Sequence, residues 1–310
     1  MSSRFIIMVR GIRTIIVIIT SFVCTFFVSG QSDFMSSQYY VLPTLYNSAA
    51  VGSKEKLNVF ADGRLQWPGL PNYPRTAALI ADMPLVVSDK RLDVGVIAYY
   101  QEAYKNKDIS VAAQISHGFK VGEGKLSIGV QPGFVSQRRF REMDSVSLVN
   151  DSITKRTRFD LGLGLWYTIK DWWIGLSVQH LTLKPESEPF IRGRSFYLMA
   201  GGNIPIKNTL IDIRPSMIYK LCDSESSFQA TVLVYWKRLF GFGSGYRYKN
   251  SIPIIATLNI KDFYLGYCYD LPTGNLSRNY GGSHELVVGY STKIDLGGSQ
   301  RFRRKSIRIM

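Results

Sequence analysis

Histidine, cysteine and acidic residues are scarce in this chain. Its 310 residues include three histidines, three cysteines and 23 aspartates and glutamates. None of His117, His180 and His284 has a second metal-binding residue at zinc-site spacing, and the scattered carboxylates form no pair suited to acid–base catalysis. The glycine-rich stretch 241–245 fits neither a nucleophile elbow nor a phosphate-binding loop. We therefore expect no catalytic residues, metal or cofactor, and no enzymatic activity.

The chain has only one long apolar run, and that run lies at its start. Thr14 to Val28 contains no charge and follows Arg4, Arg10 and Arg13. This pattern predicts a signal peptide over residues 1–30, cleaved before Gln31; a retained membrane helix is the alternative. No later stretch reaches the roughly 18 apolar residues that a membrane helix needs. An exported chain of this kind can cross a membrane only with the strands of a closed barrel.

Cysteine usage leaves the redox state open. Cys24 is lost with the signal peptide, and Cys222 and Cys268 remain. A disulfide between them in an oxidising compartment and two unpaired thiols are both compatible with the sequence.

Aromatic residues and glycine are abundant, and alternation of apolar and polar residues begins at Leu57. The chain has 18 Tyr, 17 Phe and 27 Gly. In the stretch 57–66, apolar residues such as Leu57 and Val59 occupy odd-numbered positions, whereas polar residues such as Asn58 and Asp62 occupy even-numbered positions. A period of two is typical of a strand with one apolar and one polar face. Fourteen such segments are predicted: 57–66, 75–83, 91–101, 108–118, 125–136, 157–167, 172–181, 196–204, 209–221, 227–236, 239–248, 252–260, 262–270 and 284–294.

The lengths of the segments and of their connections favour an outer-membrane barrel. Most segments have 9–12 residues, close to the roughly 9–11 of a tilted membrane strand. The long connections follow the first, fifth, seventh and thirteenth segments, whereas those after the sixth, eighth, tenth and twelfth are short. Outer-membrane barrels have long outer loops and short periplasmic turns. We therefore expect an all-β, antiparallel up-and-down barrel of about 14 strands, with both termini in the periplasm.

Two features refine this expectation. Pro132, Pro215 and Pro253 lie inside predicted strands, where proline removes a hydrogen-bond donor, so bulges, strand ends or different strand boundaries are expected there. Aromatic residues flank the short turns, as in the girdles at a membrane interface. The residues expected in the periplasmic girdle are Trp166, Tyr167, Trp172, Trp173, Tyr235, Trp236, Phe263 and Tyr264.

The net charge is strongly positive, and part of it lies at the C-terminus. The formal net charge is +15, which becomes +12 without the three signal-peptide arginines. Five positive charges lie in the tail 297–310: Arg301, Arg303, Arg304, Lys305 and Arg308. This tail is either a solvated end or a docking segment for an acidic partner or an anionic envelope polymer. An exported barrel meets no nucleic acid, so a basic nucleic-acid surface is not expected.

Several short motifs are spread over most of the chain, from about Phe34 to about Thr292, and the most specific are the stretches 265–270 and 282–286 in the C-terminal third. Their residues include Tyr46, Asn47, Gly52, Arg64, Gln66, Trp67, Pro215, Ser216, Tyr267, Tyr269, Asp270, Gly282, Ser283, His284 and Glu285. Together these motifs resemble the PorP/SprF family of outer-membrane proteins of the type IX secretion system of Bacteroidetes.

The resemblance implies a barrel of the secretion and gliding machinery. Its implied partners are periplasmic ring lipoproteins, a peptidoglycan-linked component and secreted proteins with C-terminal sorting domains, besides outer-membrane lipid. Some members of the family serve one dedicated surface protein instead. A passive channel or small-solute transporter is the alternative function, because polar residues such as Asp62 and Arg64 share one face of their strand.

The expected organisation has four parts. Residues 1–30 form the signal peptide, 31–56 form a periplasmic or lumen-plugging segment, 57–296 form the barrel and 297–310 form the basic tail. We expect residues 31–53 and inward loops to block the lumen.

Overall fold

The computed structural model describes residues 35–87, 90–141, 152–183, 193–222, 225–273 and 281–294. The expected signal peptide and basic tail lie outside these residues. The described chain forms two short 3-10 helices and 15 strands. The strands are β1 (Leu57–Leu65), β2 (Arg75–Val87), β3 (Lys90–Ala103), β4 (Asn106–Val121), β5 (Gly124–Arg141), β6 (Ser152–Ile169), β7 (Trp172–Gln179), β8 (Ser195–Gly202), β9 (Ile204–Pro205), β10 (Ile211–Cys222), β11 (Glu225–Trp236), β12 (Phe240–Arg247), β13 (Ser251–Ile260), β14 (Phe263–Pro272) and β15 (Ser283–Thr292).

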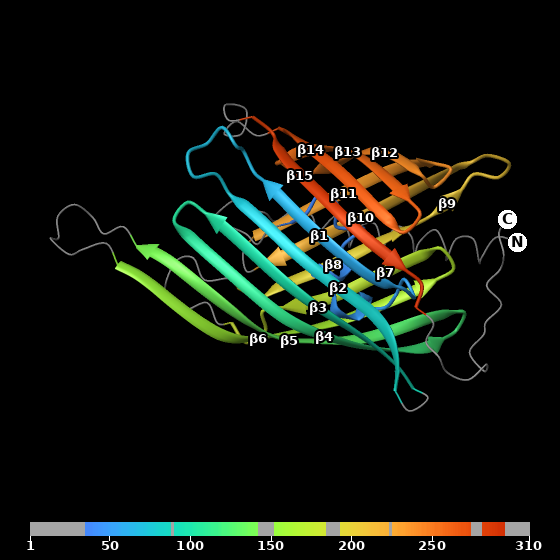
Figure 1. The fold of residues 1–310 in the computed structure, drawn as a ribbon, viewed down its shortest axis with the longest axis horizontal. Helices are drawn as coiled ribbons and strands as arrows, with labels where there is room; N and C mark the ends of the chain where they lie inside the picture. Colours follow the sequence, from blue (N-terminus) through green and yellow to red (C-terminus); the bar gives the residue numbers. More distant parts are fainter. Residues whose placement is uncertain are drawn as a thin grey trace, which may run out of the picture.

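The strands close into a barrel. Each pairs antiparallel with its neighbours, and the last strand, β15, pairs with the first, β1, from Leu57↔Thr292 to Leu65↔His284. Figure 1 shows β15 and β1 side by side. The two-residue β9 pairs only with β10, so 14 strands form the closed ring. The prediction of a 14-stranded antiparallel barrel is therefore confirmed.

Alternation along each strand separates an apolar outer surface from a polar interior. In β1 every second residue is buried, and these inward residues include Asn58, Asp62 and Arg64. The outward positions of the ring expose large apolar side chains, among them Val96, Val111, Leu163, Leu176, Val232, Leu265 and Val288. Only an apolar environment accommodates such a continuous exterior, as in outer-membrane barrels.

The two ends of the barrel differ. The end with the turns 122–123, 170–171, 237–239 and 261–262 is named the short-turn end, and the opposite end the long-loop end. At the long-loop end β5 and β6 have 18 residues each and extend beyond the predicted segments 125–136 and 157–167 (Figure 1). Their ladder continues to Arg141↔Ser152. The added residues include Arg138, Arg139 and Lys155. Most of them are polar, so the apolar–polar alternation is largely lost although pairing continues.

Pro132, Pro215 and Pro253 each interrupt a ladder without a bulge, and beside Pro215 the facing strand ends, because β8 stops at Gly202 and β9 begins at Ile204. The β4–β5 ladder lacks pairs between Ala112↔Gly133 and Ile115↔Val130, next to Pro132, and the register is the same on both sides. Equivalent gaps occur beside Pro215, between β8 and β9, and beside Pro253, between β12 and β13. Each proline lacks the N–H that one neighbouring strand would bind, while its other ladder continues.

Half of the expected aromatic girdle faces the lumen. Trp166, Tyr235 and Tyr264 are buried inside the ring, and Trp173 stacks on Trp166 at 4.8 Å between ring centroids. The outward members are Tyr167, Trp172, Trp236 and Phe263. Neighbouring residues of a strand point to opposite faces, so an aromatic pair cannot lie entirely on the lipid side.

Two further findings concern cysteine and helices. No disulfide joins Cys222 to Cys268. In the part of the chain that the structure describes, no helix is both long and apolar enough to span a bilayer.

A charged residue on the outer midsection should destabilise the barrel. Val288 is exposed in the middle of β15, opposite Ala61 and Leu265. We expect Val288→Arg to lower the free energy of unfolding by about 2–4 kcal/mol, because the guanidinium is placed near the bilayer centre. Denaturant titration in lipid vesicles measures this change. Val121→Arg, at the end of β4, is the control with an expected loss of roughly 0–1 kcal/mol; equal losses would argue against a lipid-facing midsection.

Candidate functional site

Part of the lumen is filled by the segment that precedes the first strand. We name residues 35–56 the plug. It contains the 3-10 helices η1 (Pro43–Leu45) and η2 (Ser48–Ala50), and nearly all residues from 35 to 52 are buried. Pro43 begins η1, where its missing N–H is not needed. The side chain of Asn47 caps η2 by accepting a hydrogen bond from the Ala49 amide at 2.9 Å.

Four charged residues from four strands meet at the start of the plug. Arg64 (β1), Arg247 (β12), Asp270 (β14) and Glu285 (β15) are at most 7% exposed, and together they are named the charged cluster. Arg64 binds both carboxylates and lies 2.9 Å from Glu285. Arg247 lies 3.4 Å from Asp270. Two positive and two negative charges balance, as burial of charge requires.

The charged cluster binds the backbone and hydroxyl groups of the plug. Glu285 accepts hydrogen bonds from the amides of Ser37 and Gln38 at 2.9 and 3.0 Å and from the hydroxyl of Ser36 at 2.8 Å. The Ser37 hydroxyl donates to Asp270 at 2.8 Å. Arg247 donates to the Met35 carbonyl at 3.0 Å. Charge-assisted hydrogen bonds are about twice as strong as neutral ones, so these contacts fix the start of the plug.

Further along the plug, uncharged inward residues bind its carbonyl groups. Gln114 donates to the Thr44 carbonyl at 2.8 Å, and Gln179 donates to the Leu45 carbonyl at 3.0 Å. The side-chain amide of Asn47 donates to backbone carbonyls of β6 and β7. Buried carbonyls of a short irregular segment need such partners, because no ladder supplies them.

Two glycines allow the plug to approach the wall. Gly129 of β5 faces the backbone of Ser48 and Ala49 so closely that a Cβ atom there would overlap them. Gly52 of the plug has φ +66°, and a Cβ atom on it would overlap Asp93. A larger residue at either position would force the plug away from the strands.

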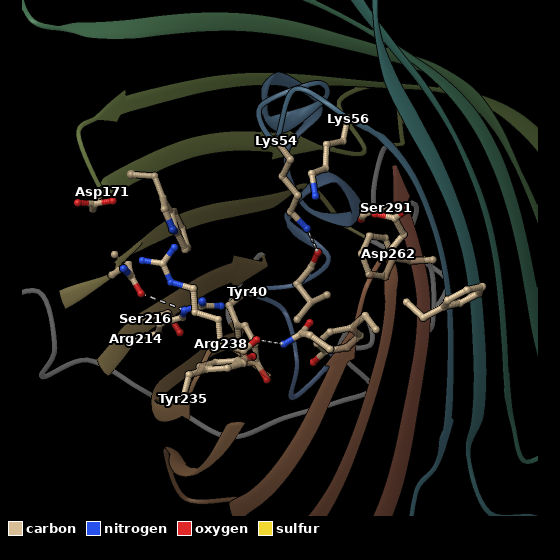
Figure 2. A pocket seen from close by; sticks show the side chains of 18 of the residues that line it. Tyr40, Lys54, Lys56, Asp171, Arg214, Ser216, Tyr235, Arg238, Asp262 and Ser291 are labelled. Carbon is tan, nitrogen blue, oxygen red and sulfur yellow. Dashed lines mark hydrogen bonds between the residues drawn. The ribbon is translucent and has the colours of Figure 1, made fainter. Parts of the chain in front are cut away.

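A cavity of about 690 Å³ lies between the plug and the short-turn end. Tyr40, Val41 and Lys54 of the plug line it on one side. Most other lining residues come from the inner face of the barrel and from the turns at 171, 238 and 261–262; Lys56 also belongs to the plug, and Phe263 lies on the outward face beside the last of these turns. Figure 2 shows the side chains of Lys54, Lys56, Arg214 and Arg238 around this space.

The lining of the cavity is basic. It includes five basic residues, Lys54, Lys56, Arg214, Arg238 and Lys261, and two acidic ones, Asp171 and Asp262. Asp212, beside the cavity, accepts a hydrogen bond from Arg238 at 2.8 Å. Lys54 donates to the Val41 carbonyl at 2.9 Å, and surrounding protein lowers its pKa to about 8, because burial disfavours the charged amine.

Comparison with known proteins identifies the family. The sequence profile of the type IX secretion system membrane protein PorP/SprF matches residues 28–290. The chain belongs to the PorP/SprF family. Together with the closed barrel, this membership makes it an outer-membrane protein of the type IX secretion family. A search of curated protein sequences finds no match.

The chain is also similar to solved barrels, at low sequence identity. Omp33 of Acinetobacter baumannii is 7% identical, with a TM-score of 0.46 over 77% of this chain and 98% of that one. The toluene transporter TodX of P. putida is 9% identical, with a TM-score of 0.44 over 81% and 94%. BamA of Haemophilus ducreyi is 9% identical, with a TM-score of 0.42 over 76% and 70%.

The residues that carried the resemblance to the PorP/SprF family separate into groups. Tyr46, Asn47 and Gly52 lie in the plug, and Arg64, Asp270 and Glu285 belong to the charged cluster. Ser283 is buried in β15, and Ser216 contacts the hydroxyl of Tyr39 at 3.0 Å. Pro215 lines the cavity, and Gln66 and Trp67 follow β1 in the first long loop.

A third group lies outside the ring at the long-loop end. The hydroxyl of Tyr267 lies 2.8 Å from Nδ1 of His284, and the rings of Tyr269 and His284 are 5.1 Å apart. The amide of Gly282 donates to the Tyr269 hydroxyl at 3.3 Å. This cluster joins β14 to β15 on the lipid side, away from the plug.

Sequence reasoning missed several residues that bind the plug or line the cavity. Gln114, Gln179, Gln229 and Asp82 bind the plug, but they read as ordinary inward residues of strands. The signal that could have found them is an amide or carboxylate at an inward position in mid-strand. The tail arginines and Lys305 lie outside the described residues. Within the described residues, no group of three or more His, Cys, Asp and Glu side chains is placed to hold a metal ion.

Removing the carboxylate of Glu285 should release the start of the plug. Glu285→Ala leaves the amides of Ser37 and Gln38 without their acceptor and breaks a buried ion pair, a change that costs about 3–5 kcal/mol. We expect hydrogen exchange at these two amides to accelerate by roughly two orders of magnitude or more.

The control is Glu102→Ala, which removes the partly exposed partner of Lys107 at the rim, 3.0 Å away. Such pairs contribute at most about 1 kcal/mol, so exchange in the plug should not change. Unchanged exchange in Glu285→Ala would show that the charged cluster does not hold the plug.

Proposed function

We propose that this PorP/SprF protein is a non-catalytic barrel of the type IX secretion and gliding machinery that works by binding other proteins. The observation that supports this role is the filled lumen. The plug is buried, and the charged cluster binds it with many hydrogen bonds. A lumen occupied in this way suits a docking component better than a pore.

The proposed partners follow from family membership. They are periplasmic ring lipoproteins and a peptidoglycan-linked component on the inner side, and secreted proteins with C-terminal sorting domains. We place the short-turn end in the periplasm, because outer-membrane barrels have short turns on that side. The chain leaves the ring at Thr292, at this end, so the C-terminal tail would also be periplasmic. The N-terminus, expected in the periplasm, lies outside the described residues; the start of the plug, at Ser37, contacts Asp270 and Glu285 toward the long-loop ends of β14 and β15.

Deletion of the protein tests its role in export. We expect a clean deletion to abolish secretion or surface display of proteins with C-terminal sorting domains, while their synthesis continues, because the apparatus lacks a docking component. Immunoblots of medium, cell surface and lysate measure this. Complementation with the unmodified chain is the control. Normal secretion in the deletion strain would contradict the proposal.

The alternative, a passive channel or small-solute transporter, makes a different prediction. Polar inward residues and the cavity at the short-turn end favour it. With the plug in place, we expect the purified protein to show no steady conductance in a planar bilayer. Glu285→Ala, which frees the start of the plug, should increase the frequency of openings. A steady open pore in the unmodified protein without partners would support the channel instead.

The basic tail is proposed to assist docking to an acidic partner. Removing residues 300–310 deletes Arg301, Arg303, Arg304, Lys305 and Arg308. We expect weaker co-purification of partners from mildly solubilised envelopes, because opposite charges steer association. The barrel itself should remain folded, as heat-dependent mobility on gels would show. Unchanged co-purification would make the tail a solvated end without a docking role.

A further inference from the structure

The cavity at the short-turn end lies inside the ring of strands, between the plug and the turns at 171, 238 and 261–262. Most of its walls are inward residues of the strands, and the plug lies on the side toward the long-loop end. Lipid surrounds the outer face of the ring, so a lipid headgroup in the bilayer does not reach this space. A ligand must therefore come from the aqueous side of the short turns. The volume of about 690 Å³ lies within the roughly 300–1,000 Å³ of ligand-binding pockets.

The charges in the cavity favour an anionic ligand. Five lining residues are basic and two are acidic. Lys56 and Lys261 make no ion pair with any described residue. An anion that enters would meet amines whose charge the protein does not neutralise.

The two arginines are held in place before any ligand arrives. The guanidinium of Arg214 lies 3.9 Å from the ring centroid of Tyr235 and donates to Asn203 at 3.0 Å. Arg238 is oriented by its hydrogen bond to Asp212 at 2.8 Å. Preorganised side chains lose little conformational entropy on binding, and planar guanidinium groups suit carboxylates.

Aromatic rings accompany these charges. Trp173, Tyr235 and Tyr264 line the same cavity, and Trp173 is stacked on Trp166 at 4.8 Å. A small inorganic anion would use the charges and leave the rings without a contact. A peptide with acidic and apolar side chains would use both. The basic tail of this chain carries the same sign of charge as the lining, so it is not a suitable occupant.

We propose that this cavity binds an acidic peptide segment of a periplasmic partner, with carboxylates on Lys56, Lys261 and the two arginines and apolar side chains against Trp173 and Tyr235. The proposal rests on the docking role and the orientation proposed above. It extends them by naming the site and the chemistry of the segment that enters it.

Direct binding tests the site without the rest of the secretion apparatus. The probe is a fluorescein-labelled hexaglutamate peptide with one phenylalanine, added to the purified full-length protein in detergent. We expect the double variant K56Q/K261Q to weaken binding about tenfold at low ionic strength, and 1 M salt to abolish most of the difference. A peptide with glutamine in place of glutamate should bind much more weakly.

The chain supplies a matched control. K105Q/K249Q removes two lysines at the long-loop end, and Lys249 (φ 53°) has the same left-handed turn conformation as Lys261 (φ 55°). Net charge falls equally in both double variants, and the tail is retained in both. Equal loss of affinity would show that only overall charge matters, and would overturn the assignment to the cavity.

Location and ligand class are tested separately. A hexaglutamate carrying p-benzoylphenylalanine should photocrosslink to residues that line the cavity, and crosslinks confined to 297–310 would overturn the proposal. Tripolyphosphate that binds more tightly than the peptide would also overturn it, because the ligand would then be a small polyanion. Binding can fail while deletion still abolishes secretion, so the outcome for this site is distinct from the outcome for the proposed function.

Discussion

The structure depends on one constraint, which is that no backbone N–H or C=O can remain unpaired in the hydrocarbon of a membrane. The pairing of β15 with β1 removes the last open edge of the sheet. Once the ring is closed, each strand has one face toward lipid and one toward the lumen. Pro132, Pro215 and Pro253 also fit this arrangement, because each interrupts only one of its two ladders and the register is kept.

Closure creates a second problem, because a ring of 14 strands encloses a lumen that its own side chains do not fill. The plug fills part of this space. Its irregular backbone is paired with inward side chains, among them Glu285, Gln114 and Gln179, rather than with another strand. The polar inward residues of this PorP/SprF protein therefore hold the plug in one part of the lumen. Toward the short-turn end they line a basic cavity instead.

Strand existence and order could be predicted because alternation is a local property. A residue such as Val59 or Leu163 shows by its neighbours alone that it faces lipid. Boundaries were less predictable. In β5 and β6 the strands continue into polar sequence, where pairing with a partner replaces apolar burial as the reason for the extended conformation. The aromatic pairs were assigned to one surface, although the same alternation places Trp166 inside and Tyr167 outside.

The sequence by itself determined that the chain is a barrel of about 14 strands, that each strand has an apolar and a polar face, and the family to which the chain belongs. It left open whether residues 31–56 lie in the periplasm or in the lumen. Only the tertiary structure placed Ser37 beside Asp270 and Glu285, more than 200 positions away, and gathered Lys54, Arg238 and Lys261 around one cavity. The reason is that alternation decides whether a side chain points inward or outward. Closure and strand register decide which distant side chains lie at the same height along the barrel axis.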